Sequence, residues 1–387
     1  MRIALLSGAD KNAGDFLIVH RSRQLLLELV DGCELVDFPR NRPLDSRLAE
    51  LNGCDAVVLA GGPGYVPDMY PGRFPLVGDL SEIKPPIFAL GMGGYTPTPN
   101  IEGIRFSDSS RRLLDRIESD GFGLGCRDVL TQRLLQANGY ASALFTGCPA
   151  WFDLSKVGEA DLLRAPRRED VRTIAISDPA VLHNIDSPKF LVEELKKAFP
   201  DAKIKLVFHR GWTSDEFSSP ELAKGQSRLA KWAESAGVEP VDIAYSHEGF
   251  AVYDECDLHV GYRVHAHLYN VSQRKPTFLI EEDGRGYGAN DALGFETHID
   301  LPRPSVPMRA ASKLLRKAGA SGVLSGGTSR KAAARMAAHV LDEIARGYPE
   351  ARKACGTASE AFHRMQSHVV QLNRLGSHEH GEGGAAR

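Results

Sequence analysis

The chain has 387 residues, of which 42% are hydrophobic and 25% are charged, and its formal net charge at neutral pH is −3. This length exceeds that of one ordinary hydrophobic core, so we expect two domains. A net charge so close to zero argues against non-specific nucleic-acid binding by counterion release, and no apolar run is long enough to span a bilayer.

The first part of the chain alternates short β-rich runs with amphipathic stretches. The expected strands are Arg2–Leu6, Ala56–Ala60, Ile87–Leu90, Phe122–Gly125 and Ala143–Thr146. The expected helices between them are Phe16–Val30, Ser109–Ile117 and Val129–Asn138. Alternation of this kind indicates βαβ units and a mostly parallel sheet.

A charged, irregular segment over residues 153–170 is the expected linker, and a second alternating series follows it. The expected strands of this series are Thr173–Ser177, Lys205–Phe208, Val241–Tyr245, Leu258–Gly261, Thr277–Ile280 and Thr297–Asp300. Its expected helices are Lys189–Ala198, Glu221–Ala236 and Val264–Ser272.

After Pro307 the pattern is helical, through Met308–Ala318, Ser329–Ala345 and Ala351–Leu375. We therefore expect Rossmann-like domains over residues 1–152 and 171–304, C-terminal helices over 305–375 and a disordered tail over 376–387. Ligands of such sheets bind at the carboxyl ends of the strands, in the cleft between two facing sheets. The six cysteines form no Cys-x-x-Cys pair, which excludes a zinc ribbon or disulfide framework and indicates a cytoplasmic protein.

The clearest site signal lies near residue 260, where a short apolar run ends in Gly261 and continues as Arg263, His265 and His267 before a helical stretch. A helix start offers free N–H groups and a favourable dipole to an anion, and arginine adds a planar fork suited to carboxylate or phosphate. An interdomain salt bridge is the alternative for Arg263. The two histidines are two residues apart, which is a poor metal pair, so we expect His265 to face a ligand and His267 to pack.

Three other segments place cations after expected strands. Arg127 precedes a helix start, where it either contacts an anion or forms a solvent-exposed pair with Asp128. His209 and Arg210 follow the strand that ends at Phe208, and Arg285 lies among acidic residues in an expected flexible loop.

Glycine-rich turns also follow strands in the first half, at residues 12–15, 60–64 and 91–94. None matches a dinucleotide fingerprint or a Walker A loop. Gly14, Gly61 and Gly62 are either parts of tight turns or places where the backbone approaches a ligand. Asn12 belongs to the first turn, and Asp15 either caps a helix beginning at Phe16 or accepts a hydrogen bond from a sugar hydroxyl.

Taken in order, these pieces resemble the polysaccharide pyruvyl transferase family over most of residues 1–300. The matching motifs are Asn12-x-Gly14-Asp15, Val57–Gly64, Arg127-Asp128, Pro149-Ala150, the run from Asp257 to Ala266, and Phe278 to Arg285. Two departures stand out: Cys148 lies where many relatives carry aspartate, and Arg285 stands near a position that is usually lysine. Arginine can bind an anion there, but it cannot act as an acid near neutral pH.

The resemblance implies two Rossmann-like domains of the glycosyltransferase-B kind and transfer of pyruvate from phosphoenolpyruvate to two sugar hydroxyls as a cyclic ketal. Arg263 and His265 would form the donor site with Arg127 as a second cation, Arg285 as an auxiliary clamp and His265 as the general acid/base. Asp15 and the turn at Gly61–Gly64 would face a saccharide acceptor, either free or lipid-linked. No cofactor or metal is expected, and the protein would be cytoplasmic, free or on the inner face of the membrane.

Two other functions remain open from the residues. A glycosyltransferase of the same architecture would bind a sugar nucleotide, with its diphosphate on the Arg and His residues. Its ribose would then lie on a carboxylate among Glu281, Glu282 and Asp283. A non-catalytic relative would bind the anion without turnover, and the fold alone does not decide between these functions.

Overall fold

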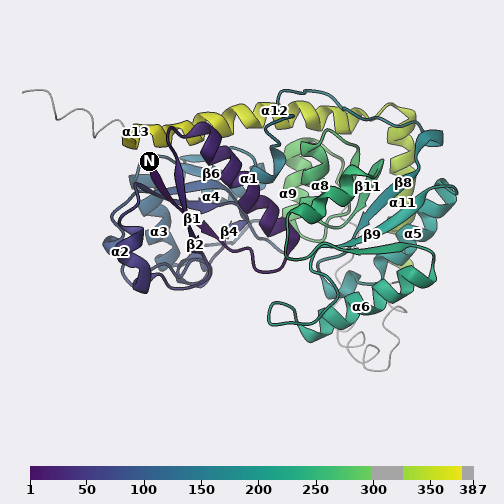
Figure 1. The fold of residues 1–387 in the computed structure, drawn as a ribbon, viewed down its shortest axis with the longest axis horizontal. Helices are drawn as coiled ribbons and strands as arrows, with labels where there is room; N and C mark the ends of the chain where they lie inside the picture. The colour runs from purple at the N-terminus through teal and green to yellow at the C-terminus, as the bar shows by residue number, and fades with distance from the viewer. Residues whose placement is uncertain (298–325, 377–387) are drawn as a thin grey trace, which may run out of the picture. The chain divides into compact units, whose positions relative to one another are not determined.

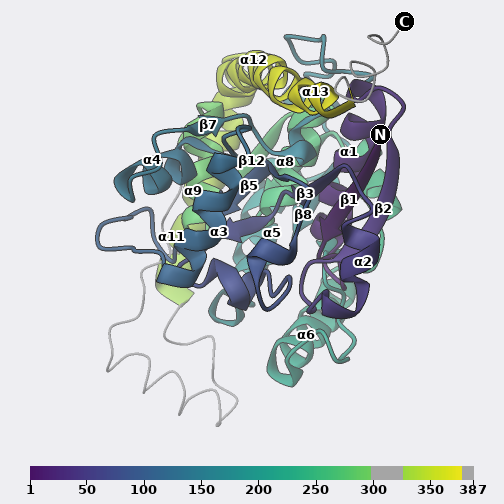
Figure 2. The same ribbon diagram turned by 90° about the vertical axis from the view of Figure 1, so that its left-hand side faces the viewer.

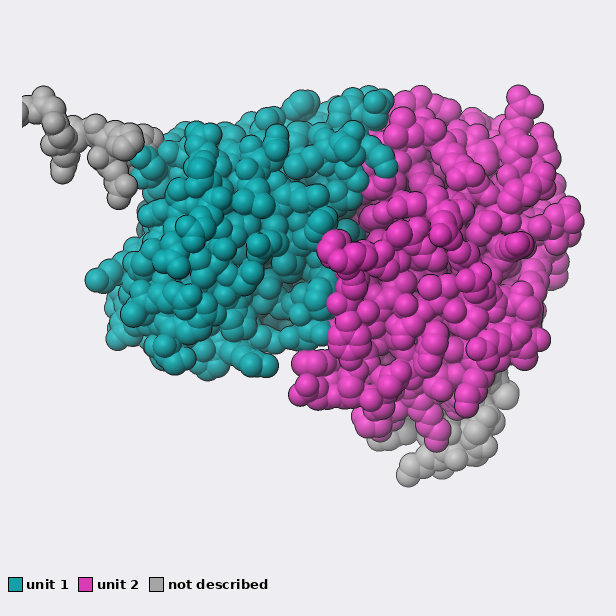
Figure 3. Space-filling model, in the orientation of Figure 1, with its two compact units in different colours: residues 1–10, 15–160, 356–387 teal, residues 11–14, 161–355 magenta. Residues whose placement is uncertain are grey.

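The computed structural model describes residues 1–297 and 326–376, and Figure 1 shows their fold. They form two compact units, coloured separately in Figure 3. Unit 1 comprises residues 1–10, 15–160 and the chain from 356 onward, and unit 2 comprises residues 11–14 and 161–355. The end of the expected strand Thr297–Asp300, the expected helix Met308–Ala318 and the tail after 376 lie outside the described residues.

Unit 1 contains a parallel sheet in the order β2-β1-β3-β5-β6-β7, with β4 paired to β5. Its strands are β1 Arg2–Ser7, β2 Glu34–Pro39, β3 Ala56–Ala60, β4 Pro63–Tyr65, β5 Ile87–Gly94, β6 Leu124–Cys126 and β7 Ala143–Phe145. Its helices include α1 Ala13–Leu29, α2 Leu48–Leu51, α3 Asp108–Ser119 and α4 Val129–Ala137. Every residue of β3 and β5 is buried, which explains why they read as continuous apolar runs.

Unit 2 contains a second parallel sheet in the order β10-β9-β8-β11-β12. Its strands are β8 Thr173–Ser177, β9 Lys203–Phe208, β10 Glu239–Asp242, β11 Leu258–Gly261 and β12 Thr277–Leu279. Its helices include α5 Ser187–Ala198, α6 Pro220–Ser235, α7 Ala251–Asp254, α8 Val264–Ser272, α9 Gly284–Leu293 and α11 Gly326–Ala345. Two parallel α/β sheets with helices at the C-terminal end confirm the predicted fold class.

The C-terminal helices return the chain to unit 1. Helix α12, Pro349–Val369, passes from unit 2 to unit 1 after Cys355, and α13, Asn373–Gly376, follows it (Figure 2). Within unit 1, the His368 imidazole stacks on Phe88 with ring centroids 4.3 Å apart and donates to the Ala89 carbonyl at 3.1 Å. Residues near the end of the chain therefore pack on the central strand β5 of the first sheet.

Local predictions differ from the structure at three places that bear on the site. Helix α1 begins at Ala13 rather than Phe16, so Asp15 lies inside the first turn. The segment expected as a flexible loop after Ile280 turns into helix α9 at Gly284, because Asp283 caps it by accepting a hydrogen bond from the Arg285 N–H. Arg263 is the N-cap of α8 rather than a first-turn residue. None of the helices in the described ranges combines the length and apolar character needed to cross a membrane.

Candidate functional site

A buried ion pair joins the carboxyl ends of two neighbouring strands in unit 2. Arg263 follows β11 and Asp178 follows β8, and these strands pair in parallel. The guanidinium donates from Nε to Asp178 Oδ1 at 2.7 Å and from Nη2 to Oδ2 at 2.6 Å. Asp178 is fully buried and Arg263 is 7% exposed. Arg263 therefore forms a salt bridge, but the expected interdomain partner is wrong, because both residues of this bidentate pair lie within unit 2. The Asp178 carboxylate also compensates for the unfavourable position of a positive charge at a helix N-terminus.

Asp178 also fixes the neighbouring strand β9. It accepts hydrogen bonds from the His209 backbone N–H at 3.1 Å and from Gln226 Nε2 at 2.8 Å. The His209 side chain is fully buried, and its Nε2 lies 2.7 Å from the Tyr253 hydroxyl. Burial, together with the charges of Arg263 and His265, holds the pKa of His209 well below its usual value, so this imidazole stays neutral.

His265 occupies the first turn of α8 and lies against Gly14. A methyl group added to Gly14 would sit 2.0 Å from His265 Nδ1, so only glycine leaves room for the imidazole. Asn12 and Gly14 belong to the short segment of residues 11–14 that packs in unit 2, where the Ala13 N–H donates to the His209 carbonyl at 2.9 Å. The N-terminal motif and the motif around residue 263 thus supply residues to one site. His267 is fully buried and bonded to Thr277, which fits its expected packing role.

Lys11, which no sequence motif marked as a site residue, anchors this segment. Its ammonium group is buried and donates to the Thr213 carbonyl at 2.7 Å and to Asp215 at 2.5 Å. Hydrogen bonds from Lys11 and Tyr245 lower the pKa of Asp215 to about 2. The positive charge of Lys11 is therefore paired with the Asp215 carboxylate. The only sequence feature that could have pointed to Lys11 is its position directly before Asn12 of the first glycine-rich turn.

The remaining cations predicted in unit 2 have protein partners. Arg285 lies in the first turn of α9 and pairs with Asp283, from Nη2 to Oδ2 at 2.6 Å. Arg210 donates from Nη2 to the Phe217 carbonyl.

Glu282 is a titratable group of the same sheet edge. It accepts hydrogen bonds from the Ala180 N–H at 2.6 Å and from Asn184 Nδ2 at 2.8 Å. Burial raises the pKa of Glu282 to about 7, and the positive charge of Arg263 opposes that rise. The carboxyl group can therefore hold a proton near neutral pH.

Arg127 occupies a similar position in unit 1, between β6 and α4. Its Nε donates to Asp128 at 3.0 Å and its Nη2 donates to the Gly94 carbonyl at 3.2 Å. A methyl group on Gly93 would lie 2.1 Å from the Arg127 guanidinium carbon. The expected local pair with Asp128 is present, but it is buried rather than exposed to water, with Arg127 only 3% exposed.

The other residues predicted in unit 1 lie at turns after its strands. Gly61 and Gly62 follow β3 with positive φ angles of 43° and 69°, a left-handed conformation that favours glycine. Asp15 lies in the first turn of α1.

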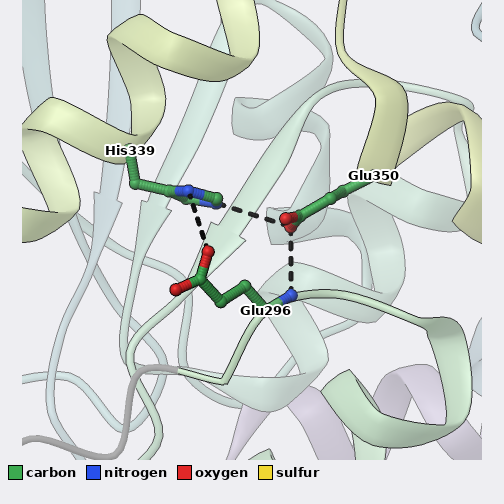
Figure 4. Close-up of side chains that lie close together, drawn as sticks. All are labelled: Glu296, His339 and Glu350. Atoms are coloured by element: carbon green, nitrogen blue, oxygen red, sulfur yellow. Dashed lines mark hydrogen bonds and ion pairs between the residues drawn. The ribbon is translucent and has the colours of Figure 1, made fainter.

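A cluster of Glu296, His339 and Glu350 in unit 2 has the composition of a metal site (Figure 4). The two imidazole nitrogens of His339 face different carboxylates, with Nδ1 3.7 Å from Glu296 and Nε2 3.4 Å from Glu350. Although burial acts in the other direction, these carboxylates raise the pKa of His339. Each ring nitrogen faces a carboxylate, so we interpret the cluster as a charge network that favours the protonated imidazole.

The fold and these residues define a two-sheet α/β protein in which an arginine and a histidine follow a buried strand at a helix start. The chain belongs to the polysaccharide pyruvyl transferase family, whose model matches residues 12–284, and it is a transferase. A comparison with curated proteins found no match.

Several solved structures are similar over nearly the whole chain at low identity. The UDP co-structure of MnaA from S. aureus has 11% identity and a TM-score of 0.49, with 93% of this chain and 94% of that chain covered. Anabaena Alr3699/HepE in complex with UDP and glucose has 12% identity and a TM-score of 0.41, with 99% and 100% covered. UDP-GlcNAc 2-epimerase from Neisseria meningitidis has 9% identity and a TM-score of 0.43, with 89% and 100% covered.

Proposed function

We propose that this transferase moves the pyruvyl group of phosphoenolpyruvate onto two hydroxyls of a saccharide and forms a pyruvate ketal. The observation that carries the proposal is the start of helix α8, where the N-cap Arg263 and the first-turn His265 lie at the carboxyl end of β11. A helix N-terminus with a guanidinium beside it suits a small donor that carries both a carboxylate and a phosphate.

The reaction needs proton transfer more than it needs a nucleophile from the protein. One sugar hydroxyl attacks the central carbon of phosphoenolpyruvate while the methylene carbon gains a proton and becomes a methyl group. The second hydroxyl then attacks the same carbon, its C–O bond to phosphate breaks, and phosphate leaves with the second proton. The two hydroxyl protons thus end on the methyl group and on phosphate, which balances the reaction.

Each residue has a role that follows from its chemistry. Arg263, oriented by Asp178, binds the anionic donor, and His265 transfers the proton because an imidazole is well matched to proton transfer near neutral pH. Glu282 is a second proton-holding group at the same sheet edge. His209 supports the site through its backbone bond to Asp178.

The other predicted residues complete the proposed substrate contacts. Arg127 supplies a second cation, and Arg285 and Arg210 are auxiliary. Asn12 and Gly14 shape the space beside His265, and we assign Asp15, Gly61 and Gly62 of unit 1 to binding of the acceptor.

The sugar-nucleotide alternative has less support from the contacts. It requires a free carboxylate for the ribose, but each acidic residue after β12 has a protein partner. Glu281 accepts from Asn290 at 2.7 Å, Glu282 accepts from the Ala180 N–H, and Asp283 caps α9 and pairs with Arg285.

The test is phosphate release from phosphoenolpyruvate with a panel of saccharides, followed by mass detection of the ketal. His265→Asn should lower kcat by about 10²- to 10⁴-fold, which is the usual contribution of a general acid or base. His247→Asn changes a half-buried histidine beside Glu248 in the same unit and serves as the control. Unchanged turnover in His265→Asn would refute its role, and transfer of a glycosyl group from a nucleotide sugar, with no phosphate released from phosphoenolpyruvate, would refute the donor.

A further inference from the structure

Unit 1 contains a buried arginine that the roles assigned above do not use. Arg40 directly follows strand β2, and its backbone N–H donates to the Ser7 carbonyl at the end of β1. The side chain is 6% exposed, and its hydrogen bond from Nη1 to the Gly61 carbonyl is long, at 3.4 Å. In residues 1–297 and 326–376 no carboxylate lies within ion-pair distance of Arg40.

A buried guanidinium without a paired carboxylate is costly, because it has lost water and gained no counter-charge. Burial lowers the pKa of Arg40, and the neighbouring guanidinium of Arg73 lowers it further, while Asp10 and Asp15 act in the opposite direction from a distance. Arg73 itself donates to the Pro63 carbonyl at 3.0 Å, and no ion pair is found for it in the described part of the chain. Arg73 therefore adds a second positive charge near Arg40.

Two glycines beside Arg40 leave room for its side chain. A methyl group on Gly8 would lie 2.4 Å from Arg40 Nε, and one on Gly62 would lie 2.9 Å from Nη1. These glycines follow β1 and β3, the two strands nearest to β2 in the sheet order. The carboxyl ends of three adjacent parallel strands therefore surround the Arg40 guanidinium, which is where ligands of such sheets bind.

We infer that Arg40, with Arg73 beside it, forms an anion-binding subsite in unit 1 for a phosphate or carboxylate group carried by the saccharide acceptor. The assignment to the acceptor rests on the proposed function, in which the donor binds at Arg263 and His265 in unit 2. The bound anion would supply the negative charge that no carboxylate of the described residues provides to Arg40. The substrate class is accordingly an acidic saccharide, such as a sugar phosphate or a uronic acid.

The first experiment measures inorganic phosphate binding and thermal unfolding of the full chain, with sodium chloride of equal ionic strength as the reference. Arg40→Met should bind phosphate at this subsite roughly 10- to 100-fold more weakly, because it loses charge-assisted hydrogen bonds. Without phosphate, Arg40→Met should be at least as stable as wild type, since the variant no longer buries an unpaired charge. Arg47→Met removes a half-buried cation that pairs with Glu50 in the same unit, and its phosphate binding should match that of wild type.

Two results of this experiment overturn the subsite: unchanged phosphate stabilisation in Arg40→Met, or loss of stability of that variant in the absence of phosphate. The second result would make Arg40 a structural hydrogen-bond donor. Gly8→Ala is a second variant, because its methyl group meets the guanidinium without requiring a positive φ. It should weaken phosphate binding in the same way, and unimpaired binding in both variants contradicts the inference.

The second experiment distinguishes the acceptor from free phosphate and separates this inference from the proposed function. Arg40→Met should raise KM for an acidic acceptor while leaving KM for phosphoenolpyruvate and for a neutral acceptor unchanged. An unchanged KM for the acidic acceptor overturns the acceptor assignment. If wild type fails to bind phosphoenolpyruvate but its phosphate binding still depends on Arg40, the proposed function fails and the anion subsite stands.

Discussion

The α-carbon of Gly14 lies against the imidazole of His265. Most of the family-matching region separates these two residues in the sequence, yet both pack in unit 2. A side chain at position 14 would overlap Nδ1, so the glycine of the N-terminal motif is explained by the position of a histidine in the second sheet.

Gly14→Ala should therefore reduce activity without unfolding the protein. Alanine favours the helix in which Gly14 lies, and no positive φ opposes it, but its methyl group would push the imidazole from its position. We expect kcat to fall by about 10²-fold because the catalytic group is misplaced, and the melting temperature to fall modestly because overpacking costs about 1–3 kcal/mol. Gly356→Ala, where an added methyl group meets nothing within 4 Å, is the control. Wild-type kcat in Gly14→Ala would show that the contact does not position His265.

Arg263→Ala should lower stability as well as activity. Removal of the guanidinium leaves the fully buried carboxylate of Asp178 without its partner, which typically costs about 3–5 kcal/mol. Urea unfolding measures this loss. The double variant with Asp178→Asn should recover much of the stability and none of the activity, and a double variant as unstable as Arg263→Ala would contradict the account.

Glu282 should make stability depend on pH in the weakly acidic range. Burial raises its folded pKa to about 7 from an ordinary value of 4.5, so the folded state holds this proton more tightly than the unfolded state does. The contribution is complete below about pH 4.5 and is lost as pH rises through about 7. Glu282→Gln should flatten the unfolding free energy across that window. An unchanged slope in this variant would show that Glu282 titrates normally.

His339 should contribute to stability in its charged form. Glu350 and Glu296 raise its pKa, so the folded state favours the imidazolium. This stabilisation is fully present below the ordinary histidine pKa of 6.5 and is lost as pH rises through the elevated folded value. His339→Gln should remove that decline, and NMR titration of the imidazole gives its pKa directly. Zinc that raises the melting temperature of wild type but not of His339→Gln would instead indicate a metal site.

The sequence predicted those strands and helices whose local pattern of apolar residues agrees with the structure they form. The strands Ala56–Ala60, Thr173–Ser177 and Leu258–Gly261 and the helix Val264–Ser272 have the predicted bounds, because each is an apolar or periodic run with clear ends. Strand β2 was missed because charged residues interrupt it. Arg40 was overlooked for the same reason, since a residue at the end of an unrecognised strand carries no signal.

The site itself was only partly predictable, because its contacts join distant segments. Arg263 and His265 stood out beside a strand end, and the same rule applied to Thr173–Ser177 would have found Asp178. The contact of Gly14 with His265 could not be read from spacing. Lys11–Gly14 packs with a sheet whose strands begin more than a hundred residues later, and no local pattern encodes such a contact.

The placement of residues 356–376 in unit 1 has a consequence for how the protein is synthesised. Strand β5 and the stretch after α1 receive His368 and Asn373 from the end of the chain. During translation, part of the surface of the first sheet therefore stays uncovered until His368 and Asn373 have been synthesised. Trimming the gene after the family-matching region would yield an N-terminal fragment with exposed apolar surface, and such a fragment is a natural client for chaperones.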